Sequence, residues 1–310
     1  MTINFEKIYS SLAEDLSGKQ KRLNIDCSIG VFYGLNKDGN FRLSFLSSRA
    51  GNKMESTKLI KVHQWKESAE VYWTCFDLVK PEAQRAFYLF CANLIESIVD
   101  EKDEYQALLS LKKRYFVWKS LFSKEPKEGL SREIVQGLFG ELYFMKKVLM
   151  EKYDVAKVIN SWSGPDLMSK DFSIDDTWYE IKTIGANSTV VKISSLAQLS
   201  SENTGHLSVI KVEQMSPEFS NGESSVEELF KSILNDLKDE VVESNFINKI
   251  TSFGVGLINE CFSIKFSVKD ICSYLVNDEF PRLTEKDVIR SEICDIKYSL
   301  ILNAISKYKE

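Results

Sequence analysis

The sequence has little of several residue types that mark particular chemistries. Histidine occurs only twice in 310 residues, and the six cysteines are scattered without a Cys-x-x-Cys pair. A structural zinc site is therefore not expected, and buried free thiols are the simpler interpretation of the cysteines. No stretch approaches the ~20 consecutive apolar residues of a membrane span, and the N-terminal residues lack an apolar signal core. We therefore expect a cytoplasmic protein with no membrane partner.

The charges are ordinary in number and uneven in distribution. Hydrophobic residues make up 44% and charged residues 27%, which is typical of a globular protein with a core, and the net charge of −5 argues against indiscriminate coating of nucleic acid. Residues 112–147 hold nine Lys and Arg against four Glu, whereas residues 217–244 hold eight acidic residues against two lysines. The basic zone can meet phosphates, or it can be the solvated face of a helix.

The chain is predicted to contain two domains. Residues 1–125 form an N-terminal α/β lobe of unknown role: "CSIGVFYGL" and "FRLSFLSS" bracket a turn as in a hairpin, "AEVYWTCFDL" is typical of a strand, and Pro81 begins a long helix. The Pro, Gly and charged residues of "SKEPKEGLSRE" mark the boundary, and residues 126–310 form the second domain.

The second domain is predicted to begin with a helix over residues 131–151, for which Ser131 is the N-cap. Strands are predicted near Lys157–Ser161, Lys170–Ile174 and Trp178–Ile184. A brief helix at "SSLAQLS" and a strand at "HLSVIKVEQ" follow, and then an acidic helix over 225–245 and a final strand at "DIKYSLILNAI". The order of the core is helix, three strands, helix, strand, which predicts an α/β fold.

The segment "DFSIDDTWYEIK" carries the strongest chemical signal. If Asp175 and Asp176 form the turn of a hairpin, Asp171 lies opposite Glu180, and their Cβ atoms are ~5 Å apart. Side chains alternate along a strand, so Lys182 shares the face of Glu180. Two acids and one amine are thus predicted to converge.

Such a pair of carboxylates repels unless a positive charge lies between its members. A divalent cation supplies that charge, and Mg²⁺ accepts one or two protein carboxylates together with water and phosphate oxygens. The backbone carbonyl of Ile181 can add a further ligand. Lys182 suits a neighbouring role, in which it orients the attacking water or stabilises the transition state. Asp171, Glu180 and Lys182 therefore point to hydrolysis of a phosphodiester.

Asp166 is the alternative to Asp171 as the first acid. Asp166 lies fourteen residues before Glu180, whereas Asp171 lies nine before it, and the hairpin register favours Asp171. Gly164 and Pro165 are better interpreted as a turn that leads into the strand.

A third acid can come from the preceding helix. Gly137 and Gly140 are each unfavourable inside a helix by ~1 kcal/mol relative to alanine, so a close backbone approach is one reason for their presence. Such packing would let Glu141 reach the site, although an exposed helical glutamate beside a packing groove is equally compatible with the sequence. Glu133 is rotated ~80° from Glu141 at 3.6 residues per turn and is the weaker candidate.

Polar residues downstream are candidates for contacts with phosphate or water. Lys192, Ser194 and Gln198 lie around the start of the predicted short helix, whose N–H groups could hold a backbone phosphate. The simpler interpretation of Ser194 is an N-cap.

The ordered motifs of residues 130–310 resemble the PD-(D/E)XK phosphodiesterase superfamily of restriction enzymes and related nucleases. Pro165-Asp166 spells the first letters of that motif, but Asp171 fits the pattern better. More narrowly, the chain resembles a bacterial family of PD-(D/E)XK motif proteins. The matching segments are Gly140-Glu141-Leu142, Trp162, Gly164-Pro165, Asp171-Phe172, Glu180 with Lys182, "EFPRL" from Glu279 to Leu283, and "KYSLIL".

The resemblance implies a restriction-endonuclease-like αβββαβ core with a mixed sheet, and it covers the N-terminal lobe only loosely. It implies hydrolysis of DNA by Asp171, Glu180 and Lys182, assisted by Glu141, with Mg²⁺ as cofactor and Mn²⁺ as its expected substitute. Members of the narrower family often sit with methyltransferases and ATPases in restriction or phage-defence clusters, so such partners are expected. Cleavage of two strands with one site per chain suggests a homodimer.

We therefore expect an endodeoxyribonuclease of a restriction-modification or anti-phage system. The alternative is a non-catalytic DNA-binding or scaffold subunit that keeps the nuclease fold, since a fold does not determine a function. The acidic net charge favours this alternative, and the complete set of Asp171, Glu180 and Lys182 opposes it. A nuclease that acts on RNA is a third interpretation.

Overall fold

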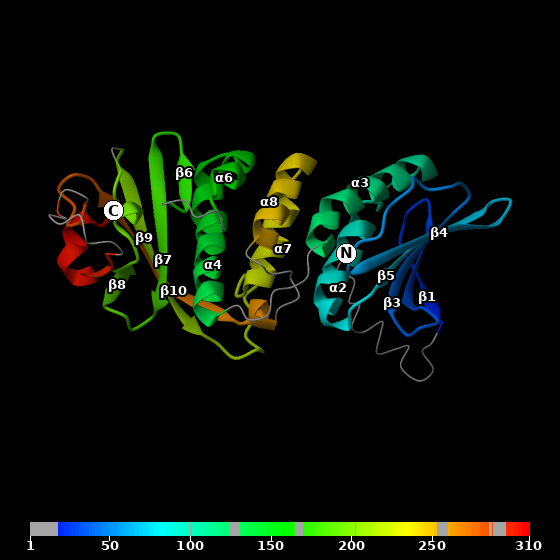
Figure 1. The fold of residues 1–310 in the computed structure, drawn as a ribbon, viewed down its shortest axis with the longest axis horizontal. Coiled ribbons are helices and arrows are strands. Elements are labelled where there is room, and N and C mark those ends of the chain that lie inside the picture. The colour runs from blue at the N-terminus through cyan, green and yellow to red at the C-terminus, as the bar shows by residue number, and fades with distance from the viewer. Residues whose placement is uncertain are drawn as a thin grey trace. The chain divides into compact units, whose positions relative to one another are not determined.

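The computed structural model describes residues 18–99, 101–123, 131–164, 170–201, 203–252, 260–284, 287 and 296–310. The chain divides into two compact units. The first consists of Met1–Lys127 with Ile250–Asn259, and the second of Glu128–Lys249 with Glu260–Glu310. The folds of the two units are shown in Figure 1.

The first unit contains a five-stranded antiparallel sheet with the strand order β1-β2-β3-β5-β4. The strands are β1 (Gln20–Leu23), β2 (Gly30–Leu35), β3 (Phe41–Ser47), β4 (Ile60–Ser68) and β5 (Val71–Leu78). The predicted hairpin is confirmed, because β2 and β3 pair from Gly30↔Leu46 to Leu35↔Phe41. Gly39 in its turn has a φ of 82°, a conformation that glycine adopts at little cost.

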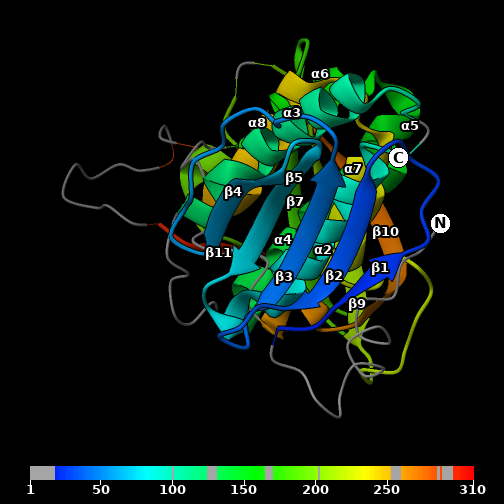
Figure 2. The same ribbon diagram turned by 90° about the vertical axis from the view of Figure 1, so that its right-hand side faces the viewer.

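Helices cover one face of this sheet, as the view in Figure 2 shows. They are η1 (Pro81–Ala83), α2 (Gln84–Glu96) and α3 (Glu104–Ser123), so the predicted helix beginning at Pro81 is confirmed. Phe76 of the sheet contacts Phe90 of α2 and Tyr115 of α3, with ring centroids 5.5 and 5.2 Å apart. This aromatic cluster is fully buried and forms the core of the unit.

The second unit is built on a four-stranded mixed sheet with the order β10-β9-β7-β6. Strands β7 and β9 are parallel, and the other two pairings are antiparallel. A separate two-stranded sheet pairs β11 with β8. The strands are β6 (Phe172–Ile174), β7 (Thr177–Gly185), β8 (Val190–Ile193), β9 (Gly205–Gln214), β10 (Phe266–Val276) and β11 (Tyr298–Ile301).

The remaining helices and helical turns place α4 against β7 (Figure 1). They are α4 (Arg132–Phe144), the π-helical segment η2 (Met145–Leu149), α5 (Met150–Lys152), α6 (Val155–Ser161), η3 (Leu196–Gln198), α7 (Val226–Asp236), α8 (Glu240–Ser252), η4 (Glu260–Ser263) and η6 (Leu302–Tyr308). Tyr179 of β7 packs on Phe144 of α4, whereas Trp178 belongs to the apolar core on the other side of the strand. The predicted α/β fold with a mixed sheet is thus confirmed.

One predicted strand is wrong. Residues Lys157–Ser161 belong to helix α6, because Asp154 caps the helix by accepting a hydrogen bond from the Lys157 N–H at 3.1 Å. Val158 and Ile159 are buried as they would be in a strand, so their burial does not distinguish the two structures. The third strand after α4 is instead β8, which pairs with β11.

Three other predicted elements are shorter than expected or divided. The brief helix at "SSLAQLS" is the single 3₁₀ turn η3. The acidic helix over 225–245 is two helices, because Leu237 is extended and ends α7. The final strand is limited to β11 and is followed by the 3₁₀ segment η6. Within the described ranges, no helix is both long and apolar enough to span a membrane.

Candidate active site

The hairpin of β6 and β7 has the predicted register. Phe172 pairs with Tyr179, Ser173 with Trp178 and Ile174 with Thr177, which leaves Asp175 and Asp176 as the turn. Asp175 has a φ of 53°, in the left-handed region that aspartate tolerates in turns.

Asp171 lies immediately before β6 and is tied to β7 by two hydrogen bonds. Its N–H donates to the carbonyl of Tyr179 at 3.1 Å, and its Oδ2 accepts from the N–H of Ile181 at 2.6 Å. The N–H and C=O of one strand residue project toward the same neighbour. The Ile181 carbonyl therefore lies on the side of β7 that faces Asp171, where the predicted ligand set requires it.

Glu180 and Lys182 form an ion pair on β7, with Lys182 Nζ 2.8 Å from Glu180 Oε1. Glu180 is only 2% exposed. Burial raises its pKa to about 8, the charge of Asp171 adds to this rise, and Lys182 opposes it. The predicted convergence of Asp171, Glu180 and Lys182 is therefore seen in the structure, although the Asp171 carboxylate is turned toward the backbone of Ile181.

Helix α4 approaches β7 very closely at one glycine. A Cβ atom at Gly140 would lie 1.8 Å from Thr183 Oγ1, whereas a Cβ at Gly137 would meet nothing within 4 Å. Gln136 also donates from Nε2 to the Thr183 carbonyl at 3.1 Å. The close approach predicted from both glycines is thus a property of Gly140 alone, and Gly137 does not need it.

This approach brings Glu141 to the acidic pair. Glu141 Oε2 accepts a hydrogen bond from Trp162 Nε1 at 2.8 Å. Burial raises the pKa of Glu141 well above its usual range, and the charges of Asp171 and Glu180 raise it further. Glu133, in contrast, is exposed in the first turn of α4.

The three acids repel one another and have few counter-charges. Burial also raises the pKa of Asp171, against the opposing hydrogen bond from Ile181 and the charges of two lysines, Lys182 and Lys170. No cluster of three or more Asp, Glu, His or Cys side chains is arranged to hold a metal within the described part of the chain. A ligand set of the Asp171 and Glu180 carboxylates with the Ile181 carbonyl stays below that number and suits Mg²⁺, which keeps several waters. The residues present therefore fit this cation.

Lys170 is a neighbour of the site to which sequence reasoning gave no role. Its ammonium donates to the carbonyls of Ala197, Gln198 and Ser200 at 2.6, 2.7 and 3.1 Å, and it lies 4.1 Å from the centroid of the Trp178 ring. Burial lowers its pKa to about 8, while the charge of Glu180 acts in the opposite direction. The one available signal was a lysine directly before Asp171.

The predicted phosphate contacts lie on the segment that Lys170 holds. Lys192 is exposed on β8, and Gln198 Oε1 accepts from the Ser194 N–H at 2.7 Å, so the two residues bind each other. Ser195, not Ser194, is the N-cap of η3, and its side chain makes no capping bond. A turn of three residues is too short to supply the helical phosphate site that was expected. The alternative acid Asp166 lies outside the described residues.

The basic zone of residues 112–147 is divided between α3 and the α4–η2 segment. Lys146 is paired with Asp236, and Lys147 with Glu223. Both acids belong to the acidic region 217–244, which therefore neutralises part of the charge that was expected to meet DNA.

An aspartate before a short strand, a Glu-x-Lys strand paired with it and a helix that carries a further glutamate define a protein of the PD-(D/E)XK nuclease-like class. The chain belongs to the family described as "Putative PD-(D/E)XK family member, (DUF4420)", whose model matches residues 5–303. No curated protein and no solved structure matches the chain.

Proposed function

We propose that this protein is a Mg²⁺-dependent endodeoxyribonuclease that hydrolyses DNA phosphodiester bonds. The observation that carries the proposal is the meeting of Asp171 with the Glu180–Lys182 ion pair, only 2.8 Å between charged atoms, where two acids are buried beside a third. Perturbed carboxylates with a specific charged partner are typical of catalytic sites.

Asp171, Glu180 and the carbonyl of Ile181 would hold the cation. When bound, the cation supplies positive charge that polarises the phosphate and lowers the pKa of a water molecule. The chain's own residues do the rest of the positioning. The hydrogen bond from Ile181 fixes the Asp171 carboxylate, and the Trp162 indole fixes Glu141 beside it.

Lys182 is the residue placed to act on the reacting groups. Its ammonium is held at Glu180 and is partly exposed, so it can orient the attacking water and stabilise charge that develops on the phosphate oxygens. The water oxygen forms a bond to phosphorus in line with the bond to the leaving oxygen, which breaks.

The test is cleavage of supercoiled plasmid with Mg²⁺ or Mn²⁺, with and without a chelator. Asp171→Ala and Lys182→Ala should each abolish cleavage, whereas Asp166→Ala should leave it largely intact. Asp176→Ala, a change to an exposed aspartate at the turn of the same hairpin, is the matched control and should retain activity. Persistent cleavage by Lys182→Ala, or cleavage that needs no metal, contradicts the mechanism.

We place this activity in a restriction-modification or anti-phage system, in the company of a methyltransferase or an ATPase. Cleavage that appears only after such a partner is added would support the placement. Sedimentation of the protein with a DNA duplex tests the homodimer that two-strand cleavage suggests. RNA as substrate in place of DNA is tested by the same assay with a labelled duplex of each kind.

The second candidate function is a non-catalytic DNA-binding or scaffold subunit. The ion pairs of Lys146 and Lys147 with acidic residues favour it, because they reduce the positive charge available to a duplex. This function predicts DNA binding or complex formation that Lys182→Ala leaves unchanged and no cleavage under any metal condition.

A further inference from the structure

The face of the N-terminal sheet that points away from its helices carries an unusual set of side chains. Val31, Tyr33, Leu43 and Phe45 are buried, so the residues that alternate with them along β2 and β3 project to the opposite face. In Figure 2 the strands lie in front of α2 and α3, so that this outer face is turned to the viewer.

Aromatic rings form a row across the outer face. Trp65 and Trp73 are paired across β4 and β5 and stack, with centroids 6.0 Å apart and an interplanar angle of 20°. Phe32 of β2 continues the row, 5.2 Å from the Trp73 ring. Trp65 is 42% exposed, although exposed indoles are uncommon on monomeric proteins.

The row is held in place rather than loosely attached. Trp73 Nε1 donates to Glu67 Oε2 at 2.9 Å, which fixes the indole at the centre of the row. Leu46 lies opposite Trp73 on β3 and fills the space between Trp73 and the β2 strand. The rings therefore offer a flat apolar surface that needs little ordering when a ligand binds.

Basic side chains lie along the same face. Arg22 is opposite Phe32 at one end of the row, and Lys61 is opposite Asp77 on the adjacent strands; both are exposed. Arg42 also projects to this face, where it is bound to Asp77 at 2.5 and 2.6 Å. The buried acid is thereby neutralised, and the exposed charges of the face next to the rings are positive.

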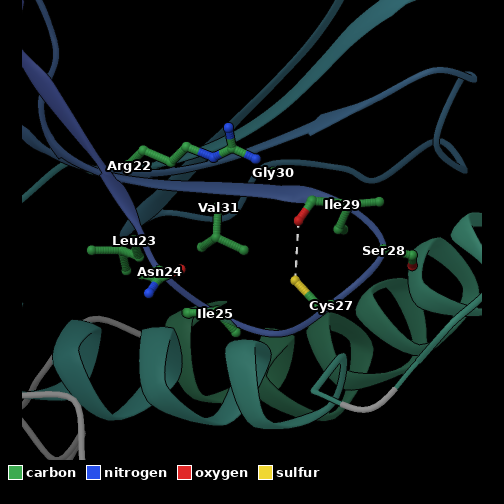
Figure 3. A pocket seen from close by; sticks show the side chains of 9 residues that line it. All are labelled: Arg22, Leu23, Asn24, Ile25, Cys27, Ser28, Ile29, Gly30 and Val31. Carbon is green, nitrogen blue, oxygen red and sulfur yellow. Dashed lines mark hydrogen bonds between the residues drawn. The ribbon is translucent and has the colours of Figure 1, made fainter.

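The position of Arg22 is clear in Figure 3, which shows a pocket of about 490 Å³ lined by residues 22–25 and 27–31. Val31 and Leu23 point toward the helices, whereas Arg22 lies on the other side of the strands. Its guanidinium therefore belongs to the outer face.

We propose that this face binds single-stranded nucleic acid. Bases stack on aromatic side chains whatever their identity, and Arg and Lys beside the rings contact the phosphates between them. A duplex hides the flat surfaces of its bases, so the rings select a single strand. This binding needs no metal and lies in a unit other than the one that carries the acids, so it is independent of the proposed hydrolysis.

The test is fluorescence anisotropy of a labelled oligothymidine 20-mer titrated with the full chain in a chelator. Trp65→Ala should weaken binding roughly tenfold, and Trp65→Tyr, which keeps a ring, should restore most of it. Arg22→Ala should weaken binding and reduce the slope of log affinity against log salt by about 0.7. Quenching of tryptophan emission on binding should disappear in part with Trp65→Ala.

Two controls keep the result specific. Phe116→Ala removes a ring that is 49% exposed on α3, away from this face, and should not change the affinity. Asp171→Ala should lose plasmid cleavage while it keeps oligonucleotide binding, which separates the two proposals. Affinity that is the same in wild type, Trp65→Ala and Arg22→Ala overturns the inference, as does a duplex bound more tightly than the single strand. Self-association that Trp65→Ala abolishes, with oligonucleotide binding unchanged, assigns the face to a second copy of the chain and overturns it as well.

Discussion

Glu180 is the residue whose environment differs most from water. Its ordinary pKa of 4.5 is raised to about 8 by burial and by Asp171, so the metal-free folded protein holds a proton on Glu180 at neutral pH that the unfolded chain releases. A group with a raised carboxyl pKa stabilises the fold most below the unfolded value, and this stability is lost as pH rises through the folded value.

The thermal midpoint in a chelator should therefore fall as pH rises from about 5 to about 8 through this contribution. Glu180→Gln, which is neutral at every pH, should flatten the slope. Differential scanning calorimetry of both proteins across this pH range measures the effect. Equal slopes in wild type and Glu180→Gln would show that the carboxyl is ionised in the folded protein.

Trp162 permits a second prediction at this scale. Trp162→Phe removes the donor to Glu141 Oε2 and leaves a buried carboxyl oxygen without that partner. Such a loss costs about 1–3 kcal/mol of stability. Denaturant unfolding gives this cost, and plasmid cleavage should fall as Glu141 loses its orientation. Trp162→Phe with unchanged unfolding free energy and unchanged cleavage would deny the indole this role.

The elements of the site owe their arrangement to α4 and β7. Gly140→Ala would place a Cβ atom 1.8 Å from Thr183 Oγ1, so the helix has to move or Thr183 has to turn. Such overpacking costs about 1–3 kcal/mol. Cleavage should also decrease, because Glu141 moves with the helix.

Gly137→Ala is the matched control within the same helix. A Cβ there meets nothing within 4 Å, and alanine is the better helix former by about 1 kcal/mol, so this variant should be slightly more stable than the wild type. Urea unfolding of the two variants compares them directly. The interpretation fails if Gly140→Ala is no less stable than Gly137→Ala.

The sequence predicted the β6–β7 hairpin well, because two adjacent aspartates mark a turn and the alternation of strand side chains then determines the register from Asp171 to Glu180. It did not distinguish α6 from a strand, since Val155–Ser161 is a short apolar run without a clear period, and the cap at Asp154 was missed. The difference between Gly137 and Gly140 depends on Thr183, which lies far along the chain. The acceptors of Lys170 are backbone carbonyls of a distant segment, which composition and spacing do not reveal.

At the scale of the whole molecule, a bound cation should link the site to folding. Ligands that bind the folded state alone stabilise it by about 2.7 kcal/mol at a concentration one hundred times Kd. The thermal midpoint of the wild type should rise with Mg²⁺, and the rise should be larger at high pH, because the carboxylates have to lose their protons to bind the cation. Asp171→Ala with Glu180→Gln should remove the response, and a rise that survives in this double variant would place the cation elsewhere.

The ion pair within β7 has a consequence for the resting protein. Lys182 gives Glu180 a built-in counter-ion, so a cation that arrives there exchanges with a charge already present instead of filling an empty acidic pair. The protein thereby stays folded and electrically balanced during idle periods, and its occupancy rises when the negative charge of a polymer backbone is delivered at the same time.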